Sequence, residues 1–244
     1  MKQSIFEIIR HEQLTETVFR MVLKGDTSDI TATGQFVNVR LEGKFLRRPI
    51  SVCDWDAETL TLVYKVVGLG TEQMSKMQAG EKLDILTGLG NGYNLNAGFE
   101  KPLLIGGGVG VPPLFALCKA LVNKGVKPVA ILGFNKKEEI FLKEDFEALG
   151  VETIIATADG SYGVKGFVTD AMKTVDSYDY FFSCGPEPML KAVSFACECS
   201  GQLSFEERMA CGFGACMGCS CKTKYGNKRI CKDGPVLVKE EVIW

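Results

Sequence analysis

The sequence has one histidine and two tryptophans in 244 residues, and it has no excess of positive charge. Its 28 lysine and arginine residues are offset by 30 aspartate and glutamate residues, which gives a formal net charge of −2 at pH 7. Nucleic-acid-binding domains need a strongly basic face to neutralise phosphates. This charge balance therefore argues against nucleic acid as a partner.

Long apolar runs are also missing. The apolar stretches are strand-sized and interrupted by glycine or charge, so none approaches the ~20 residues needed to span a bilayer. Residues 1–7 contain no basic region followed by an apolar core, so no secretory signal is expected. We expect a cytoplasmic protein with no membrane partner.

Cysteine, by contrast, is plentiful. A reducing compartment disfavours disulfides, so ten cysteines favour metal binding or redox chemistry. Five of them are scattered, and the other five crowd into 21 positions near the carboxyl terminus. The crowded five are Cys211, Cys216, Cys219, Cys221 and Cys231.

Residues 1–98 read as short strands separated by turns, with β-branched or aromatic content and few helix signals. This pattern predicts a small six-stranded antiparallel barrel. The expected strands are Ile5–Arg10, Thr17–Leu23, Phe36–Leu41, Ile50–Asp54, Leu60–Val67 and Lys82–Leu86.

Residues 99–200 alternate strand and helix patterns, which predicts a parallel sheet covered by helices on both faces. Residues 201–244 are rich in cysteine and glycine and too irregular for a core of their own, so we expect a lobe held by a metal. One expected strand of the second domain starts at Pro102, and the others are Lys127–Gly133, Thr153–Ala158 and Tyr178–Ser183. The expected helices are Pro112–Asn123, Phe141–Leu149, Val168–Lys173 and Glu187–Cys199.

The cysteine spacing in the lobe is C-x₄-C-x₂-C, from Cys211 to Cys219, followed by eleven residues and then Cys231. The first three match the plant-type [2Fe–2S] pattern. Glycines between them let one loop curl around an inorganic core. Their N–H groups can also approach the sulfurs and tune the potential.

A structural zinc site with four cysteines is the alternative. Zinc sites favour two C-x₂₋₄-C pairs with a longer spacer, which fits this loop less well. Cys221 is expected to face away from the site, although it is the one plausible substitute ligand.

The barrel contains a candidate diphosphate clamp at residues 47–51, Arg-Arg-Pro-Ile-Ser. Arginine offers a bidentate charged fork and serine a short hydroxyl donor. Downstream, residues 68–71 offer backbone amides and a hydroxyl before the helix-like stretch Glu72–Met77, an arrangement that suits phosphate. Each signal alone is weak, and a surface ion pair beside a strand is the alternative.

Two motifs mark a candidate nucleotide site in the second domain. Residues 106–113, Gly-Gly-Gly-Val-Gly-Val-Pro-Pro, follow a strand and open a helix, with proline where the usual dinucleotide fingerprint has glycine. Residues 184–189, Cys-Gly-Pro-Glu-Pro-Met, end the last expected strand, where a nicotinamide ring could lie. A ligand-free tight turn and a buried small cysteine are the respective alternatives.

These motifs, in this order over essentially the whole chain, resemble the ferredoxin-reductase superfamily. In detail they resemble the electron-transfer subunits of NAD-linked (class 1B) dihydroorotate dehydrogenases, most specifically at residues 206–219. The resemblance implies FAD contacts at Arg48, Pro49, Ile50, Ser51, Lys65, Val66, Val67, Gly70 and Thr71. It implies NAD contacts at Gly107, Gly108, Gly110, Pro112, Cys184, Gly185, Pro186 and Met189, and a [2Fe–2S] cluster on Cys211, Cys216, Cys219 and Cys231.

Two departures from the family pattern are visible. Thr87 stands where proline is expected, which weakens the expectation of barrel closure, and the linker before Cys231 is short.

The resemblance also implies a reaction. A partner, the FMN-containing dihydroorotate dehydrogenase catalytic subunit, would send electrons through the cluster to FAD and then to NAD⁺, within a heterotetramer of two copies of each subunit. No catalytic acid or base is then needed on this chain, so His11 is expected to be a surface or barrel residue.

Two rival hypotheses remain open. One is an NAD(P)H:ferredoxin-type reductase subunit, although such relatives often carry Asp at a cluster position where this chain has Cys211. The other is a non-enzymatic, zinc-stabilised docking module. Nucleotide preference is also open, because Asn135-Lys136-Lys137 could accept a 2′-phosphate.

Overall fold

The computed structural model describes residues 1–244 and begins with the expected barrel. Six antiparallel strands close in the order β1-β2-β5-β4-β3-β6. Thr87 supports this closure, because its buried hydroxyl donates a hydrogen bond to the Lys2 carbonyl on the neighbouring strand. The strands are β1 Lys2–Gln13, β2 Val18–Lys24, β3 Phe36–Val39, β4 Arg48–Trp55, β5 Thr59–Lys65 and β6 Lys82–Leu89, and helix α1, Leu69–Ser75, lies between β5 and β6.

Strand β3 is buried on both faces. Val37 and Val39 point into the barrel core, whereas Phe36 packs in the apolar cluster that contains Cys219 and Cys231. Successive side chains of a strand point to opposite sides, so the outer face of β3 meets the carboxyl-terminal part of the chain. The barrel and the cysteine-rich lobe therefore share an interface.

The second sheet has seven strands in the order β10-β9-β8-β7-β11-β12-β15. All its neighbouring strands are parallel except β15, which pairs antiparallel with β12. The strands are β7 Pro102–Gly107, β8 Val129–Phe134, β9 Glu152–Thr157, β10 Val164–Lys165, β11 Tyr180–Cys184, β12 Gly201–Ser204 and β15 Val236–Val238. The helices are α2 Val111–Asn123, α3 Lys143–Ala148, α4 Val168–Met172 and α5 Glu187–Ala196, with short 3₁₀ turns at Gly108–Gly110, Lys137–Glu139 and Lys239–Glu241.

The sequence did not predict strands β12 and β15. Both fall within residues 201–244, where we expected an irregular lobe, and both extend the sheet of the second domain. Only the segment between them leaves the sheet, and it carries the short hairpin of β13, Ser220–Thr223, and β14, Gly226–Arg229. The lobe is therefore an excursion between two strands of the main sheet.

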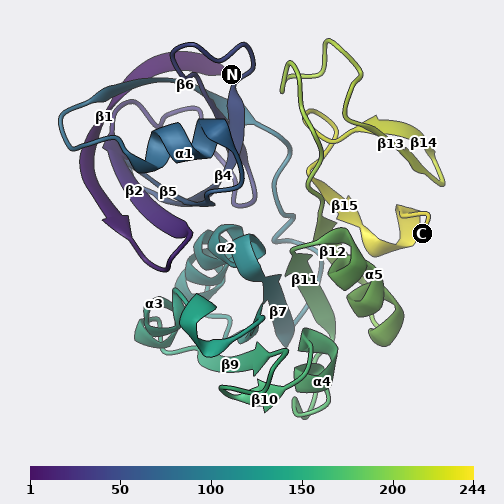
Figure 1. The fold of residues 1–244 in the computed structure, drawn as a ribbon. Helices are drawn as coiled ribbons and strands as arrows, with labels where there is room; N and C mark the ends of the chain where they lie inside the picture. The colour runs from purple at the N-terminus through teal and green to yellow at the C-terminus, as the bar shows by residue number, and fades with distance from the viewer.

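Helix α2 lies against the barrel, which Figure 1 shows above the second domain. Lys119 of α2 donates to both carboxylate oxygens of Asp54 on β4, at 2.7 and 3.0 Å. Arg20 of β2 donates to both carboxylate oxygens of Asp145 on α3, at 2.9 and 3.0 Å. These two ion pairs fix the barrel against the second domain. None of the helices is long and apolar enough to span a bilayer.

Candidate cofactor sites

The two neighbouring arginines of the barrel motif have different surroundings. Arg47 donates a 3.0 Å hydrogen bond to the Asp84 carboxylate and two more to backbone carbonyls, so the protein itself neutralises it. Burial opposes ionisation of Asp84, but the hydrogen bond and charge of Arg47 outweigh burial and hold the Asp84 pKa below its ordinary value. Arg48 donates only to the carbonyls of Leu46 and Arg47 and has no carboxylate partner. Its charge is available to a diphosphate.

Arg48 lies directly over the start of helix α1. A Cβ atom added to Gly70 would fall 2.1 Å from the Arg48 Nε, so glycine is what allows the guanidinium to lie there. Thr71 orders the same turn, because its hydroxyl accepts from the Val67 N–H at 3.0 Å and donates to the Gly68 carbonyl at 3.1 Å.

The remaining flavin candidates border this region. Pro49 and Ser51 oppose Asn38 and Phe36 of β3, and paired residues share one side of a sheet. Since Phe36 faces outward, Pro49 and Ser51 lie on the outer face of the barrel. The other candidates are Ile50 on β4, Lys65 at the end of β5, and Val66 and Val67 in the loop to α1.

The two nucleotide motifs meet at the centre of the seven-stranded sheet. β7 has β8, β9 and β10 on one side and β11 on the other, so the chain reverses its direction of winding between β7 and β11. Ligands of open α/β sheets bind beyond the carboxyl ends of strands at such a switch point. Gly106, at the end of β7, is paired with Cys184, at the end of β11. The fold thus places both motifs side by side.

The loops are in direct contact, and glycine makes the contact possible. A Cβ atom on Gly110 would fall 2.2 Å from the Cys184 carbonyl oxygen, and one on Gly107 would fall 2.4 Å from the Met189 sulfur. Pro112 occupies the first turn of α2, where a missing N–H costs nothing. Burial raises the Cys184 pKa to about 12, so this thiol stays neutral and contributes shape and polarisability rather than charge.

Two further loops border this site, and the sequence pointed to only one of them. Residues 135–137 follow β8, and Asp159 and Ser161 follow β9, the next strand away from the switch point. The Lys137 N–H donates to the Ser161 hydroxyl at 2.8 Å, which ties the loops together. Hydrogen bonds from the Ser161 hydroxyl and N–H hold the Asp159 pKa below its ordinary value. A carboxylate thus lies beside the lysines that we considered for a 2′-phosphate.

The four candidate cluster cysteines are arranged in two pairs. The Cys216 N–H donates to the Cys211 sulfur at 3.4 Å, and the Cys231 N–H donates to the Cys219 sulfur at the same distance. Burial opposes ionisation of Cys211, but N–H groups of Cys216, Phe213 and Ala215 lower its pKa to about 6. Burial and the neighbouring thiol of Cys219 raise the pKa of Cys231 to about 12.

This arrangement fits a binuclear cluster. A [2Fe–2S] cluster needs two cysteines on each of two irons, and the two hydrogen-bonded pairs supply two cysteines each. The N–H groups directed at sulfur are the donors that tune such clusters. Cys221 lies on β13 opposite Lys228 and makes no sulfur hydrogen bond to the four cysteines, so the structure supplies no reason to make it a ligand.

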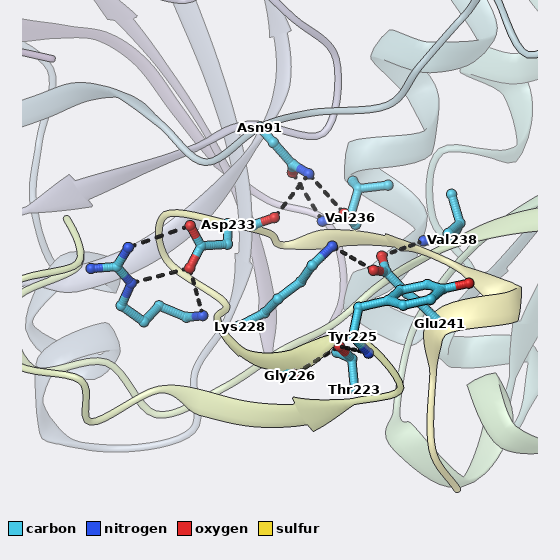
Figure 2. Close-up of polar contacts among 10 residues, drawn as sticks. Asn91, Thr223, Tyr225, Gly226, Lys228, Asp233, Val236, Val238 and Glu241 are labelled. Atoms are coloured by element: carbon cyan, nitrogen blue, oxygen red, sulfur yellow. Dashed lines mark hydrogen bonds and ion pairs between the residues drawn. The ribbon is translucent and has the colours of Figure 1, made fainter.

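A polar network anchors the second half of the lobe. Figure 2 shows the Asn91 side chain donating to the carbonyls of Asp233 and Val236, at 3.3 and 2.7 Å, and accepting from the Val236 N–H at 3.1 Å. In the same view Lys228 of the hairpin pairs with the buried carboxylate of Glu241, which also accepts from the Val238 N–H at 3.0 Å. The segment that carries Cys231 is therefore anchored to both the barrel and the sheet.

The single histidine lies in the barrel, as expected. Its two ring nitrogens contact the Tyr64 hydroxyl at 2.9 Å and the Met77 carbonyl at 2.8 Å. His11 thus bridges two parts of the barrel wall.

Comparisons with known proteins agree with this architecture. Residues 206–243 match the model of the iron-sulfur cluster binding domain of dihydroorotate dehydrogenase B, and residues 104–194 match the oxidoreductase NAD-binding domain. A solved NADH-dependent reduced ferredoxin-NADP oxidoreductase superimposes with a TM-score of 0.90 at 30% identity, over 98% of this chain and 90% of that one. A ferredoxin NADP⁺ reductase from Neisseria gonorrhoeae, solved with FAD and NADP, has a TM-score of 0.71 at 19% identity, over 80% of this chain and 91% of that one.

The fold and the cysteine lobe together define a reductase of the ferredoxin-reductase class with an added iron–sulfur domain. The electron-transfer subunit of dihydroorotate dehydrogenase B (NAD(+)) from Geobacillus sp. (strain WCH70) is 43% identical over all of this chain and 99% of its own length. The corresponding subunit from Fusobacterium nucleatum is 42% identical over 94% of each chain. The chain belongs to this family of electron-transfer subunits.

Proposed function

We propose that the chain carries electrons from a dihydroorotate-oxidising flavin subunit to NAD⁺, in pyrimidine biosynthesis in the cytoplasm. The observation that carries the proposal is the placement of the three candidate sites around one region. The nucleotide loops lie at the switch point, α2 starts there and packs on β4, and the lobe covers the outer face of β3 beside β4. An electron route from the lobe through the barrel to the nucleotide would therefore run only through neighbouring helices, strands and loops.

Each group would have defined residues. Cys211, Cys216, Cys219 and Cys231 would hold the [2Fe–2S] cluster, Arg48 would neutralise the FAD diphosphate, and the loops at 107–112 and 184–189 would hold NAD. The bound cluster supplies one-electron transfer and the bound flavin supplies conversion to a two-electron hydride. The chain itself positions these groups and provides no acid or base.

The partner in this proposal is an FMN-containing catalytic subunit, and the assembly contains two copies of each chain. The relatives are named electron-transfer subunits of dihydroorotate dehydrogenase B, which supports a separate catalytic subunit. An electron-transfer subunit needs a separate subunit that oxidises the substrate.

Co-expression with the candidate catalytic subunit tests the proposal. We expect the purified complex to contain FMN, FAD and iron and to reduce NAD⁺ when dihydroorotate is added. The isolated chain should oxidise NADH with an artificial electron acceptor but should not respond to dihydroorotate. A chain that binds FAD and iron yet forms no complex, and never makes NADH from dihydroorotate, would contradict the partner assignment.

A ferredoxin-linked reductase is the second candidate, because the solved oxidoreductase of that kind covers nearly the whole chain. The same preparation separates the two functions. Reduced ferredoxin should replace dihydroorotate as electron donor only if the second candidate is correct.

A further inference from the structure

Asn38 lies between the predicted flavin strand and the cluster loop. It sits on β3, is 1% exposed, and points to the outer face of the barrel like its neighbour Phe36 two residues earlier. Its partner on β4 is Pro49 of the flavin motif, and its partner on β6 is Leu86. One strand spacing, about 4.8 Å, therefore separates it from the predicted flavin strand.

One end of the Asn38 amide touches the cluster loop. Its Nδ2 donates to the Cys211 carbonyl at 3.4 Å. A Cβ atom on the next residue, Gly212, would fall 1.9 Å from the same Nδ2, and Gly212 has a φ of +75°. The loop that presents the first cluster ligand thus rests directly on this side chain.

The other end of the amide has no partner. Asn38 Oδ1 is buried and accepts no hydrogen bond, although its backbone carbonyl is satisfied by Arg47. Buried polar atoms are nearly always hydrogen-bonded, so an orphan acceptor needs a reason. The oxidised flavin ring carries one ring N–H group, which is a donor of the kind that this acceptor lacks.

We propose that Asn38 is a positioning residue that joins the flavin to the cluster loop. Its Nδ2 fixes the Cys211–Gly212 segment, and its Oδ1 accepts a hydrogen bond from the flavin bound beside β4. This inference rests on the proposed function, because it requires that both FAD and the cluster are present.

Asn91 provides the matched control. It also holds the lobe to the barrel, through the backbone of Asp233 and Val236, and all of its side-chain contacts are within the protein. Loss of Asn91 should loosen the lobe without affecting the flavin. Loss of Asn38 should affect both cofactors.

The test compares Asn38→Ala, Asn38→Asp and Asn91→Ala in the full chain loaded with FAD and iron. The readouts are the FAD dissociation constant, the flavin absorption spectrum, the iron content and the electron paramagnetic resonance spectrum of the reduced cluster. Asn38→Ala should weaken FAD binding about five- to tenfold, the effect of one lost hydrogen bond, and shift both spectra. Asn91→Ala should leave the FAD dissociation constant and flavin spectrum unchanged.

Asn38→Asp tests the two ends of the Asn38 amide separately, because the aspartate side chain keeps an acceptor and lacks the amide donor. It should change the cluster spectrum while FAD binding stays within about twofold of the parent. If Asn38→Ala binds FAD as tightly as the parent, or Asn38→Asp leaves the cluster spectrum unchanged, Asn38 is only a lobe anchor. A parent chain that takes up neither FAD nor iron would instead contradict the proposed function.

Discussion

The nucleotide loops at residues 106–112 and 184–189 differ from the cluster loop at 211–219 in what surrounds their glycines. Gly110 of the nucleotide loops lies against the backbone of Cys184 and Gly107 against the Met189 side chain, whereas Gly212 and Gly214 both lie against side chains, those of Asn38 and Lys232. Backbone cannot move aside, but the end of a flexible side chain can. The nucleotide loops are therefore shaped by the fold itself.

The cluster loop, by contrast, depends more on what it binds. Cys216 and Met217 in its middle are exposed, and Met217 has a φ of +61°, a conformation that costs a non-glycine residue about 1 kcal/mol or more. Cys219 at its end, and Cys231 beyond it in the chain, are buried in the apolar cluster shared with the sheet. The same chain thus builds one preformed site and one that the cofactor completes.

The largest effect is expected from Cys216→Ser in the cluster loop. Removing one of four thiolates should abolish cluster assembly, because a [2Fe–2S] cluster needs two cysteines on each of two irons. Iron and sulfide content should fall to near zero and electron transfer from the partner should stop, while NADH oxidation with artificial acceptors through FAD persists. Cys221→Ser is the control and should retain full iron. Equal iron loss in both variants would show that the ligand assignment is wrong.

Gly110→Ala tests whether the nucleotide loops are rigid. The new Cβ atom would lie 2.2 Å from the Cys184 carbonyl oxygen, so the two loops must separate. We expect kcat/KM for NADH to fall about 100-fold, as small displacements of bound reactants commonly cause.

The control is Gly125→Asn. Nothing lies within 4 Å of the Cβ position there, and asparagine tolerates the φ of +79°. Its kcat/KM for NADH should match the parent. A Gly110→Ala variant with normal kinetics would mean that the loops can move apart freely.

Arg47 and Arg48 allow a similar comparison within the barrel, between an arginine held by the protein and one without a carboxylate partner. Arg48→Met should weaken FAD binding about tenfold or more, because a charge-assisted contact to phosphate is lost, and should leave apo-protein stability nearly unchanged. Arg47→Met should do the opposite and lower the free energy of unfolding by about 2 kcal/mol, because Asp84 loses its closest charged partner and keeps only the contacts with Arg40 and Gln3. FAD titration and urea unfolding of the apo-protein measure the two effects. If both variants weaken FAD binding equally, the two arginines do not have the separate roles that we assign to them.

The smallest effect is the pH dependence of the Asp84 pair. The Asp84 pKa is held below the ordinary value of 3.8. The stability that the ionised Asp84 side chain contributes is therefore complete when the pH is above the ordinary pKa, and it is lost as the pH falls through the lowered pKa. Asp84→Asn should be about 1 kcal/mol less stable than the parent at pH 7. The difference should shrink on acidification below the ordinary value. Urea unfolding at pH 7, 4 and 3 measures it, and a difference that grows with acid would contradict the assignment.

The regular parts of the fold were readable from the sequence. Alternating apolar residues predicted all six barrel strands, and the alternation of strands and helices predicted the parallel sheet and its four helices. Strands β10, β12 and β15 were not predicted. β10 is two residues long, and β12 and β15 are three or four residues long and lie in a segment rich in cysteine and glycine. Such short strands are specified by their neighbours in the sheet rather than by their own pattern.

For a similar reason, the sequence indicated some of the candidate site residues and not others. Spacing alone indicated three of the candidate cluster cysteines and the nucleotide loops, because those motifs are contiguous, whereas Cys231 lies eleven residues further on. These assignments stay predictions. Spacing could not show that Arg47 is engaged by Asp84 while Arg48 has no carboxylate partner, since Asp84 comes from another strand. Asn38, Asn91 and Asp159 were missed because single polar residues become meaningful only through distant partners.

The most direct measurement is a metal, sulfide and flavin analysis of the anaerobically purified chain, with a spectrum taken after reduction by NADH. The account predicts two irons, two sulfides and one FAD per chain, and a paramagnetic signal from a reduced binuclear cluster once NADH is added. One zinc per chain, with no iron and no yellow flavin, would contradict it.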